Sequence, residues 1–251
     1  MSLDYQQALV IGGSSGVGRE LSLNLAKKGV HTIVAARGAA GLAQLAGEAA
    51  NIETVAIDAS RDGAAGELLA THKPDLLVLA GGQRPKIAAV HEMGWEDFSA
   101  TWNSDTKMAF EFTKAALTLP LAEGATIVSF SSGAALAGSP LSGGYAGAKR
   151  MQHFLVNYGQ READRLGLGL NFLSIIPKQL IAGTDIGKEA SAAYAASAGI
   201  DVEKFMGQWD TPLTAELAGA HLVDLLDQPQ EAKQAGARAF AITGAGAEAM
   251  A

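Results

Sequence analysis

The sequence contains no cysteine, which excludes disulfides, thiolate metal ligands and a cysteine nucleophile. Aromatic residues are also scarce, at 6% of the 251 residues. Positive charge is in deficit, because 19 Lys and Arg stand against 26 Asp and Glu, for a formal net charge of −7. Since there is no run of basic residues either, the sequence argues against a nucleic-acid partner, whose phosphates would require one.

Long apolar runs are missing as well. The strongest runs, residues 8–11 and 76–80, are each followed at once by two glycines and fall far short of the roughly 18 residues of a membrane span. The first seven residues lack the basic and apolar regions of a signal peptide. The five histidines show no pairing at the spacing of a metal site. We therefore expect a cytoplasmic protein with no membrane partner and no metal.

Short apolar runs rich in β-formers recur in the first third of the chain. They lie at residues 8–11, 31–35, 54–57 and 76–80. Their starts are 23, 23 and 22 residues apart, which leaves room for one helix between successive strands and is typical of a parallel sheet. Further strands are predicted at 126–130, 170–176 and 239–242, and helices at 19–28, 95–119 and 145–166. We predict one doubly wound α/β domain over residues 1–251 with about seven strands, whose 30 Gly and 49 Ala favour close packing of helices on the sheet.

Two segments depart from this regular alternation. Residues 178–212 form an irregular insertion that carries Tyr194, Phe205 and Trp209, and we expect a small lid with an apolar underside. Its aromatic content predicts a partly apolar ligand. The tail after Gly244 is rich in Ala and Gly, and we expect it to be loosely held.

A glycine-rich turn follows the first predicted strand and leads into a helix. Glycine lets the backbone turn sharply, and its missing Cβ lets a pyrophosphate approach the helix N-terminus. The hydroxyls of two serines in the turn can add hydrogen-bond donors. The candidate contacts are Gly12, Ser14, Ser15, Gly16, Val17 and Gly18. In a series of alternating strands and helices, this turn predicts dinucleotide binding; the alternative is a tight structural turn that happens to be glycine-rich.

The end of the second predicted strand indicates which dinucleotide is bound. An acidic residue there would bond the ribose 2′-hydroxyl and repel a 2′-phosphate. This chain has Ala36 and then Arg37, whose guanidinium suits the extra phosphate of NADP(H), unless Arg37 is a solvated residue that begins a loop. Asp58 and Ala59 follow the third predicted strand. There Asp58 can accept a hydrogen bond from an adenine amino group, or it can instead cap a helix starting at Ser60.

A second group of residues can do acid–base chemistry. Tyr145 and Lys149 are four apart in a predicted helix, so they share one face with Cβ atoms roughly 6 Å apart. A phenol, with a reference pKa of about 10, is a poor acid–base group at neutral pH, but a nearby ammonium favours the phenolate. Ser132 ends the fifth predicted strand, and its hydroxyl can hold a substrate carbonyl. The alternatives are Ser131 in place of Ser132, and an exposed Tyr beside a solvated Lys.

Together, the glycine turn, Ser132 and Tyr145-x-x-x-Lys149 resemble the short-chain dehydrogenase/reductase family in its short, single-domain form. The resemblance covers nearly the whole chain and implies the strand order 3-2-1-4-5-6-7. It implies hydride transfer between a nicotinamide, NADPH being preferred, and a carbonyl or alcohol. Tyr145 would be the general acid. Lys149 would lower the pKa of Tyr145 and bind the ribose, and Ser132 would hydrogen-bond the substrate carbonyl. Asn103 matches the family's helix-four Asn, which supports a water relay to the Lys, unless it is simply a polar surface residue.

The resemblance also extends to the ends of strands four and six, where the cofactor contacts are expected at Ala80, Gly81, Gly82 and Pro177. The chain departs from the family pattern here. An Asn-Asn-Ala-Gly stretch is replaced by Leu79-Ala-Gly-Gly82, a Pro-Gly by Pro177-Lys178, and the Thr that usually follows is displaced to Thr184. These departures favour a dinucleotide-binding sensor or scaffold, or redirected chemistry; the intact Asn, Ser, Tyr and Lys favour an enzyme.

The two long helices tend to pair across a subunit interface in this family, which implies a homodimer or homotetramer. Their apolar residues are otherwise most simply interpreted as core. They are Phe110, Phe112, Leu117, Phe154, Leu155 and Tyr158.

Overall fold

The apolar runs of the sequence form the strands of one sheet in a computed structural model, which describes residues 3–227 and 238–250. The sheet has eight strands in the order β3-β2-β1-β4-β5-β6-β7-β8, and this confirms the predicted order of the first seven. The strands are β1 Gln7–Ile11, β2 His31–Ala36, β3 Ile52–Ala56, β4 Leu76–Leu79, β5 Thr126–Phe130, β6 Asn171–Pro177, β7 Ala239–Thr243 and β8 Gly246–Ala249. All neighbouring pairs are parallel except β7 and β8.

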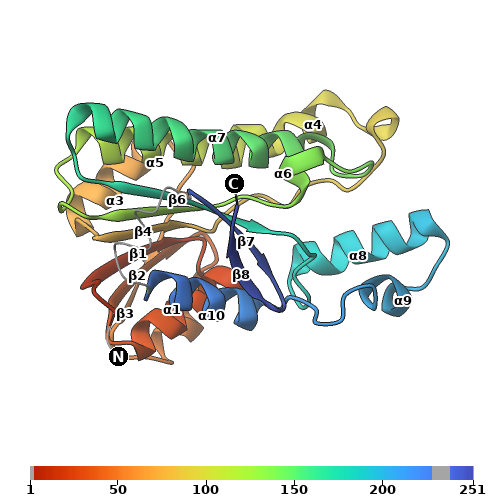
Figure 1. Ribbon diagram of the computed structural model, residues 1–251, viewed down its shortest axis with the longest axis horizontal. Helices are drawn as coiled ribbons and strands as arrows, with labels where there is room; N and C mark the ends of the chain where they lie inside the picture. The colour runs from red at the N-terminus through yellow and green to blue at the C-terminus, as the bar shows by residue number, and fades with distance from the viewer. Residues whose placement is uncertain (1–2, 228–237, 251) are drawn as a thin grey trace.

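Helices cover both faces of this sheet, as Figure 1 shows. On one face lie α3 Ala64–His72, α4 Trp95–Thr101, α5 Lys107–Thr118 and α7 Gly143–Leu166. On the other lie α1 Gly16–Lys27, α2 Ala39–Ala46 and α10 Ala215–Leu226. Because both faces are covered, the central strands β4 and β5 are buried at every position rather than at alternate ones.

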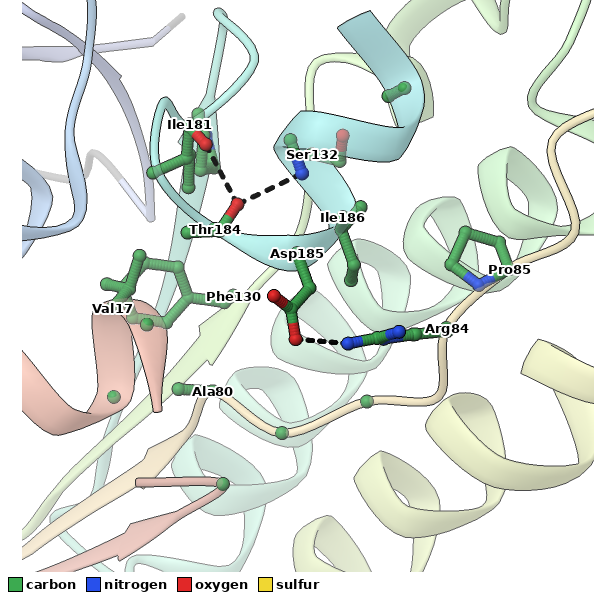
Figure 2. Close-up of a pocket in the computed structure, with 18 of the residues that line it drawn as sticks. Val17, Ala80, Arg84, Pro85, Phe130, Ser132, Ile181, Thr184, Asp185 and Ile186 are labelled. Atoms are coloured by element: carbon green, nitrogen blue, oxygen red, sulfur yellow. Dashed lines mark hydrogen bonds and ion pairs between the residues drawn. The ribbon is translucent and has the colours of Figure 1, made fainter. Parts of the chain in front are cut away.

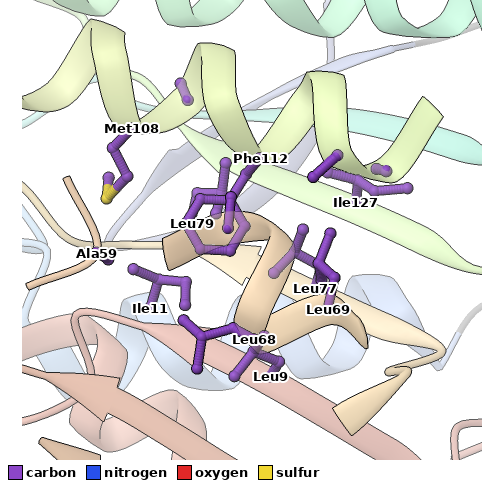
Figure 3. Packing of buried hydrophobic residues seen from close by; sticks show 14 of the residues in the cluster. Leu9, Ile11, Ala59, Leu68, Leu69, Leu77, Leu79, Met108, Phe112 and Ile127 are labelled. Atoms are coloured by element: carbon purple, nitrogen blue, oxygen red, sulfur yellow. The ribbon is translucent and has the colours of Figure 1, made fainter. Parts of the chain in front are cut away.

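Successive residues of β1 serve the two sides of the core. Leu9 and Ile11 pack with Leu79 and Phe112 beneath α3 and α5, where Figure 3 shows them in one cluster. Ala8 and Val10 belong to the cluster on the opposite face, which includes Leu21 of α1 and Leu222 of α10.

The predicted helix over 95–119 is interrupted. Between α4 and α5 the backbone forms a π-helix, Trp102–Thr106, whose wider turn accommodates an extra residue. Short π-helical segments inside α-helices occur frequently at functional sites. The apolar periodicity of the sequence did not reveal this π-helix.

The apolar residues of α5 and α7 differ in their exposure to solvent. Phe112 and Leu155 are buried as expected, but Phe110, Phe154 and Tyr158 are exposed, contrary to their interpretation as core. The reason is that each helix packs only one face on the sheet, and these three rings lie on the outer face.

The C-terminal tail corrects a second expectation. Instead of hanging loosely, residues after Gly244 form β8, which pairs antiparallel with β7 from Thr243 and Gly246 to Phe240 and Ala249. β8 is largely exposed, so its sequence shows little of the hydrophobic pattern of a strand. Backbone pairing with β7, contact with α10 and the ion pair of Glu248 with Lys178 place it at the edge of the sheet.

The insertion between β6 and α10 contains two helices, α8 Asp185–Ala198 and α9 Val202–Met206, which extend beyond the end of the sheet (Figure 1). Local capping explains both starts. The Thr184 hydroxyl accepts from the Gly187 N–H at 3.0 Å, and the Asp201 carboxylate accepts from the Lys204 N–H at 2.6 Å. No helix in the described residues is both long and apolar enough to cross a membrane.

The start of α7 is held against α4 by a glycine contact. A Cβ at Gly144 would overlap the Phe98 carbonyl oxygen, whereas a Cβ at Gly147 would have no neighbour within 4 Å. We expect Gly144→Ala to lower the free energy of unfolding by about 1–3 kcal/mol through steric overlap. Gly147→Ala, on the same helix, should instead raise it by up to about 1 kcal/mol through helix propensity. Urea unfolding of both variants measures this, and equal stabilities would contradict the close packing.

Candidate functional site

A cavity of about 1520 Å³ opens at the carboxyl ends of the parallel strands. This is the edge at which open α/β sheets bind their ligands. Of the residues that the sequence marked as candidates, all but Asn103 line this cavity. They are Gly12, Ser14, Ser15, Gly16, Val17, Gly18, Arg37, Asp58, Ala59, Ala80, Gly81, Gly82, Ser132, Tyr145, Lys149 and Pro177. Figure 2 shows part of the wall, with Val17, Ala80 and Ser132 approaching from different elements.

The glycine turn lies against the end of β4. Gly12 has a φ of 88°, and a Cβ there would overlap the backbone of Gly81. A Cβ at Gly18 would lie 2.5 Å from the Gly12 carbonyl oxygen. Helix α1 begins at Gly16, and the Ser15 side chain makes no capping hydrogen bond. The first N–H groups of α1 therefore face the cavity without a side-chain cap, which suits a phosphate group.

The outer end of the cavity carries Arg37, which follows β2 directly. Ser14 of the glycine turn lies close by, because its Oγ would be 3.1 Å from a Cβ on Gly38. Arg37 and Ser14 thus both line this end of the cavity.

Asp58 lies on the neighbouring wall. Its Oδ1 accepts from the Ser60 N–H at 2.9 Å and from the Ser60 hydroxyl at 2.7 Å. These two hydrogen bonds, with weaker attraction from Arg37, hold the pKa of Asp58 below its usual value. Helix α3 begins only at Ala64, with Gly63 as its N-cap, so the alternative that Asp58 caps a helix starting at Ser60 is wrong. Asp58 instead closes a local turn.

The phenol and the ammonium lie one turn apart on α7. The Lys149 Nζ is 5.6 Å from the centroid of the Tyr145 ring. Lys149 is buried, and its Nζ donates to the Phe130 carbonyl oxygen at 3.3 Å. The main chain of Lys149 is held too, because the Ser131 hydroxyl donates to its carbonyl oxygen at 2.8 Å. These contacts attach α7 to the end of β5.

The two serines at the end of β5 differ in what their hydroxyls do. Ser131 is buried and donates to the backbone of α7. Ser132 is partly exposed in the cavity, where its Oγ accepts from the Ala134 N–H at 3.2 Å. Since this bond uses only a lone pair, the Ser132 O–H remains available to donate into the cavity.

The structure does not bring Asn103 to this site, which corrects the prediction made from the sequence. Asn103 is exposed on the π-helix and lines a separate hollow with Trp102, Phe110 and Leu155. Asp105, two residues further on, lines the cavity instead and lies beside Lys149, with 3.5 Å between its Oδ2 and the Lys149 Nζ. Only the π-helix decides which of these neighbouring residues turns inward.

The far wall of the cavity is aromatic. Tyr194 of α8 stacks on Phe205 of α9 with 6.0 Å between ring centroids, and Phe205 meets Trp209 edge-on at 6.1 Å. All three residues line the cavity. The Tyr194 hydroxyl is hydrogen-bonded to the Ser139 hydroxyl, which joins α8 to the loop before α7.

Several charged or polar groups of the insertion already have partners. Figure 2 shows Arg84, from the segment after β4, paired with Asp185 of α8; Arg84 also contacts Glu189 at 3.1 Å. Thr184 donates to the Ile181 carbonyl oxygen at 2.8 Å while capping α8, so its hydroxyl serves the fold. Lys178 lies at the cavity wall with its Nζ 3.5 Å from Glu248 of β8.

Comparison with known proteins gives a consistent result. A family model described as short chain dehydrogenase matches residues 6–197. An uncharacterized short-chain type dehydrogenase/reductase of Sinorhizobium fredii is 28% identical over 191 residues, covering 74% of this chain and 76% of the relative.

Solved structures resemble the fold. A variant of the actinorhodin polyketide ketoreductase, crystallised with NADPH, has a TM-score of 0.78 at 22% identity, covering 97% of this chain and 98% of that one. A short chain dehydrogenase from Mycobacterium avium has a TM-score of 0.75 at 19% identity, covering 98% and 84%. At such identities the likeness concerns the fold alone.

The glycine turn yields a direct test. Gly12 and Gly29 both have positive φ, at 88° and 91°, but only a Cβ at Gly12 would meet other atoms within 4 Å. Gly29→Ala should lose about 1–2 kcal/mol of stability through backbone strain, and Gly12→Ala should lose more, because its Cβ also overlaps the Gly81 backbone. Only Gly12→Ala should weaken dinucleotide binding, by more than tenfold, because the turn must move off the end of β4. Titration of NADPH fluorescence measures this, and unchanged affinity in Gly12→Ala would mean that the turn does not form the binding surface.

Proposed function

Because the chain belongs to the short-chain dehydrogenase/reductase family, we propose that it reduces a carbonyl compound with NADPH, with Tyr145 as the general acid. Members of this family are oxidoreductases that act on CH–OH or carbonyl groups with a nicotinamide cofactor. The observation that carries the proposal for this chain is the meeting of Ser132, Tyr145 and Lys149 in the cavity that also contains the glycine turn.

The residues present fit a dinucleotide. Gly12 lets the turn pack against Gly81 at the end of β4, the uncapped start of α1 suits a pyrophosphate, and Arg37 with Ser14 suits a 2′-phosphate. Pro177 and the segment Ala80 to Gly82 border the inner part of the cavity, where the nicotinamide end would lie. When bound, NADPH supplies the hydride.

The chain's own residues handle the oxygen and the proton. The Ser132 hydroxyl donates to the substrate carbonyl oxygen and orients it. As the oxygen becomes an alkoxide, Tyr145 gives it the phenolic proton. The Lys149 ammonium, 5.6 Å from the ring centroid, stabilises the phenolate that remains. Asp58 and Ala59 flank the adenine end, where Asp58 can accept from the amino group.

The substrate that suits this cavity is largely apolar. Tyr194, Phe205 and Trp209 provide a stacked aromatic wall, and Leu141 and Ile186 also line the cavity. Such a wall favours ketones with a ring or an alkyl chain over short polar carbonyl compounds. Loss of NADPH absorbance with a panel of small, alkyl and aryl ketones tests the function and the preference together.

A binding protein without catalysis is the competing function. It is favoured by one observation: the Thr184 hydroxyl is used to cap α8, so this Thr offers no free donor to a nicotinamide amide. NADPH binding without turnover on any member of the ketone panel would favour this function.

The family resemblance also leads us to propose a homodimer or homotetramer. Phe110 of α5 and Phe154 and Tyr158 of α7 are exposed, and the last two rings stack 6.3 Å apart. Outer helix faces with several exposed rings are typical of an association surface. Light scattering of the purified protein measures the assembly.

We expect Tyr145→Phe to lower kcat by at least about 100-fold, because it removes the proton donor and leaves the ring in place. NADPH affinity should change less than threefold. Tyr158→Phe on the outer face of the same helix is the matched control and should retain activity. Wild-type kcat in Tyr145→Phe would refute the assignment of the acid.

We expect Arg37→Ala to weaken NADPH binding by about tenfold or more, since a charge-assisted hydrogen bond is worth about 1.5–3 kcal/mol. NADH binding should not change, because NADH has no 2′-phosphate. Arg61→Ala, an exposed arginine outside the cavity that pairs with Glu67, serves as the control. Equal losses for both cofactors, or faster turnover of the wild type with NADH, would contradict NADP(H) preference.

A further inference from the structure

One buried carboxylate lies beside the proposed acid–base pair and is given no role by it. Asp105 is fully buried at the inner end of the cavity, on the π-helix between α4 and α5. Burial of a carboxylate is costly unless a counter-charge or hydrogen-bond donors compensate for the lost water. The contacts of Asp105 therefore show which groups compensate for the burial of its charge.

The two carboxylate oxygens have different partners. Oδ1 accepts from the Gln83 N–H at 2.8 Å, which connects the π-helix to the segment after β4. Oδ2 makes no hydrogen bond among the described residues, and the Lys149 Nζ lies 3.5 Å from it. The Lys149 ammonium is thus placed between the Phe130 carbonyl oxygen, the Asp105 carboxylate and the face of the Tyr145 ring.

Neighbouring residues make room for this carboxylate. A Cβ at Gly82 would lie 2.6 Å from Oδ2, so only glycine allows the carboxylate its present position. On α7, Gln152 is three residues after Lys149 and donates to the Asp105 carbonyl oxygen at 3.4 Å. Helix α7 therefore contacts both the main chain and the side chain of Asp105.

The other charged groups near these elements have partners of their own. Lys107 pairs with Asp62 at 2.6 Å, and Arg84 pairs with the carboxylates of α8. His153, the next ionisable group along α7 apart from Arg150, contacts Ser174 at 3.1 Å; burial, with the nearby Arg150 charge, lowers its pKa. Among the described residues, Asp105 is thus the one acidic group within ion-pair distance of Lys149.

We propose that Asp105 is a positioning residue for Lys149: its carboxylate holds the ammonium at the inner end of the cavity and balances its charge beside Tyr145. A negative charge at this point makes it harder for both the phenol and the ammonium to lose a proton. Removal of this charge should therefore change the pH dependence of the reaction. This inference rests on the proposed function, but the position of Lys149 can be tested without turnover.

The first experiment uses the cofactor-free protein. Acetic anhydride acylates only neutral amines, so the rate of acylation at Lys149, followed by peptide mass spectrometry at fixed pH, reports its neutral fraction. Asp105→Asn keeps the shape and the acceptor for Gln83 but removes the charge, and we expect at least threefold faster acylation of Lys149. Asp227→Asn is the matched control, because Asp227 pairs with Lys28 at 3.2 Å on the surface and water screens that pair. Its effect on Lys28 should be less than twofold.

The second experiment uses the active enzyme. Because removal of a negative charge makes every neighbouring group lose its proton more easily, each limb of the pH profile of kcat/KM should move to lower pH in Asp105→Asn, with the Asp227→Asn profile unchanged. Gly82→Ala is a second variant, which should displace Oδ2 and change acylation in the same direction by a smaller factor. If Asp105→Asn does not fold, Gly82→Ala still tests the effect of the Asp105 carboxylate on Lys149.

The outcomes separate the two proposals. Folded Asp105→Asn with wild-type acylation of Lys149 would overturn the positioning role, whatever the activity. If Asp105→Asn does not fold, wild-type acylation in Gly82→Ala would overturn it equally. Faster acylation in a protein that reduces no ketone would support the position of Lys149 while removing the proposed function.

Discussion

The placement of Lys149 against the end of β5 is the contact on which the rest of the site depends. Its side chain donates to the Phe130 carbonyl oxygen, and its main chain accepts from the Ser131 hydroxyl. Both contacts join the middle of α7 to the last residues of one strand. Tyr145 lies one turn earlier on the same helix, and Ser132 is the second residue after the strand. Fixing Lys149 therefore also restricts the distance between the phenol and the serine hydroxyl.

Close approach of backbones makes such a cavity possible. Gly12 and Gly81 bring the first turn against the end of β4, and Gly144 brings the start of α7 against α4. Gly82 likewise allows the close approach of the Asp105 carboxylate. The abundance of small residues is thus spatially organised: the glycines with the tightest contacts lie where segments from different parts of the chain meet around the cavity.

Much of this arrangement could be predicted from the sequence because it depends on local patterns. Strand spacing predicted a parallel sheet, the family resemblance implied its order, and the cavity contains the predicted turn residues, Arg37, Ser132, Tyr145 and Lys149. The misses have physical causes. β8 is held by backbone pairing and shows little hydrophobic pattern, and the rings of Phe110, Phe154 and Tyr158 lie on the outer side of helices whose other side is buried. Asn103 and Asp105 are separated by one residue, and a π-helix selects between them.

The sequence by itself determined which segments become strands and helices, and which residue types stand at strand ends and helix starts, because apolar periodicity and glycine spacing act over a few neighbours. Only the tertiary structure decided which polar groups face one another. The pairing of Asp105 with Lys149 joins residues 44 positions apart, and it depends on a local widening of the helix, a glycine after β4 and the packing of α7 on the sheet. No local sequence pattern predicts this pairing, since each of the segments involved is also compatible with a different neighbour.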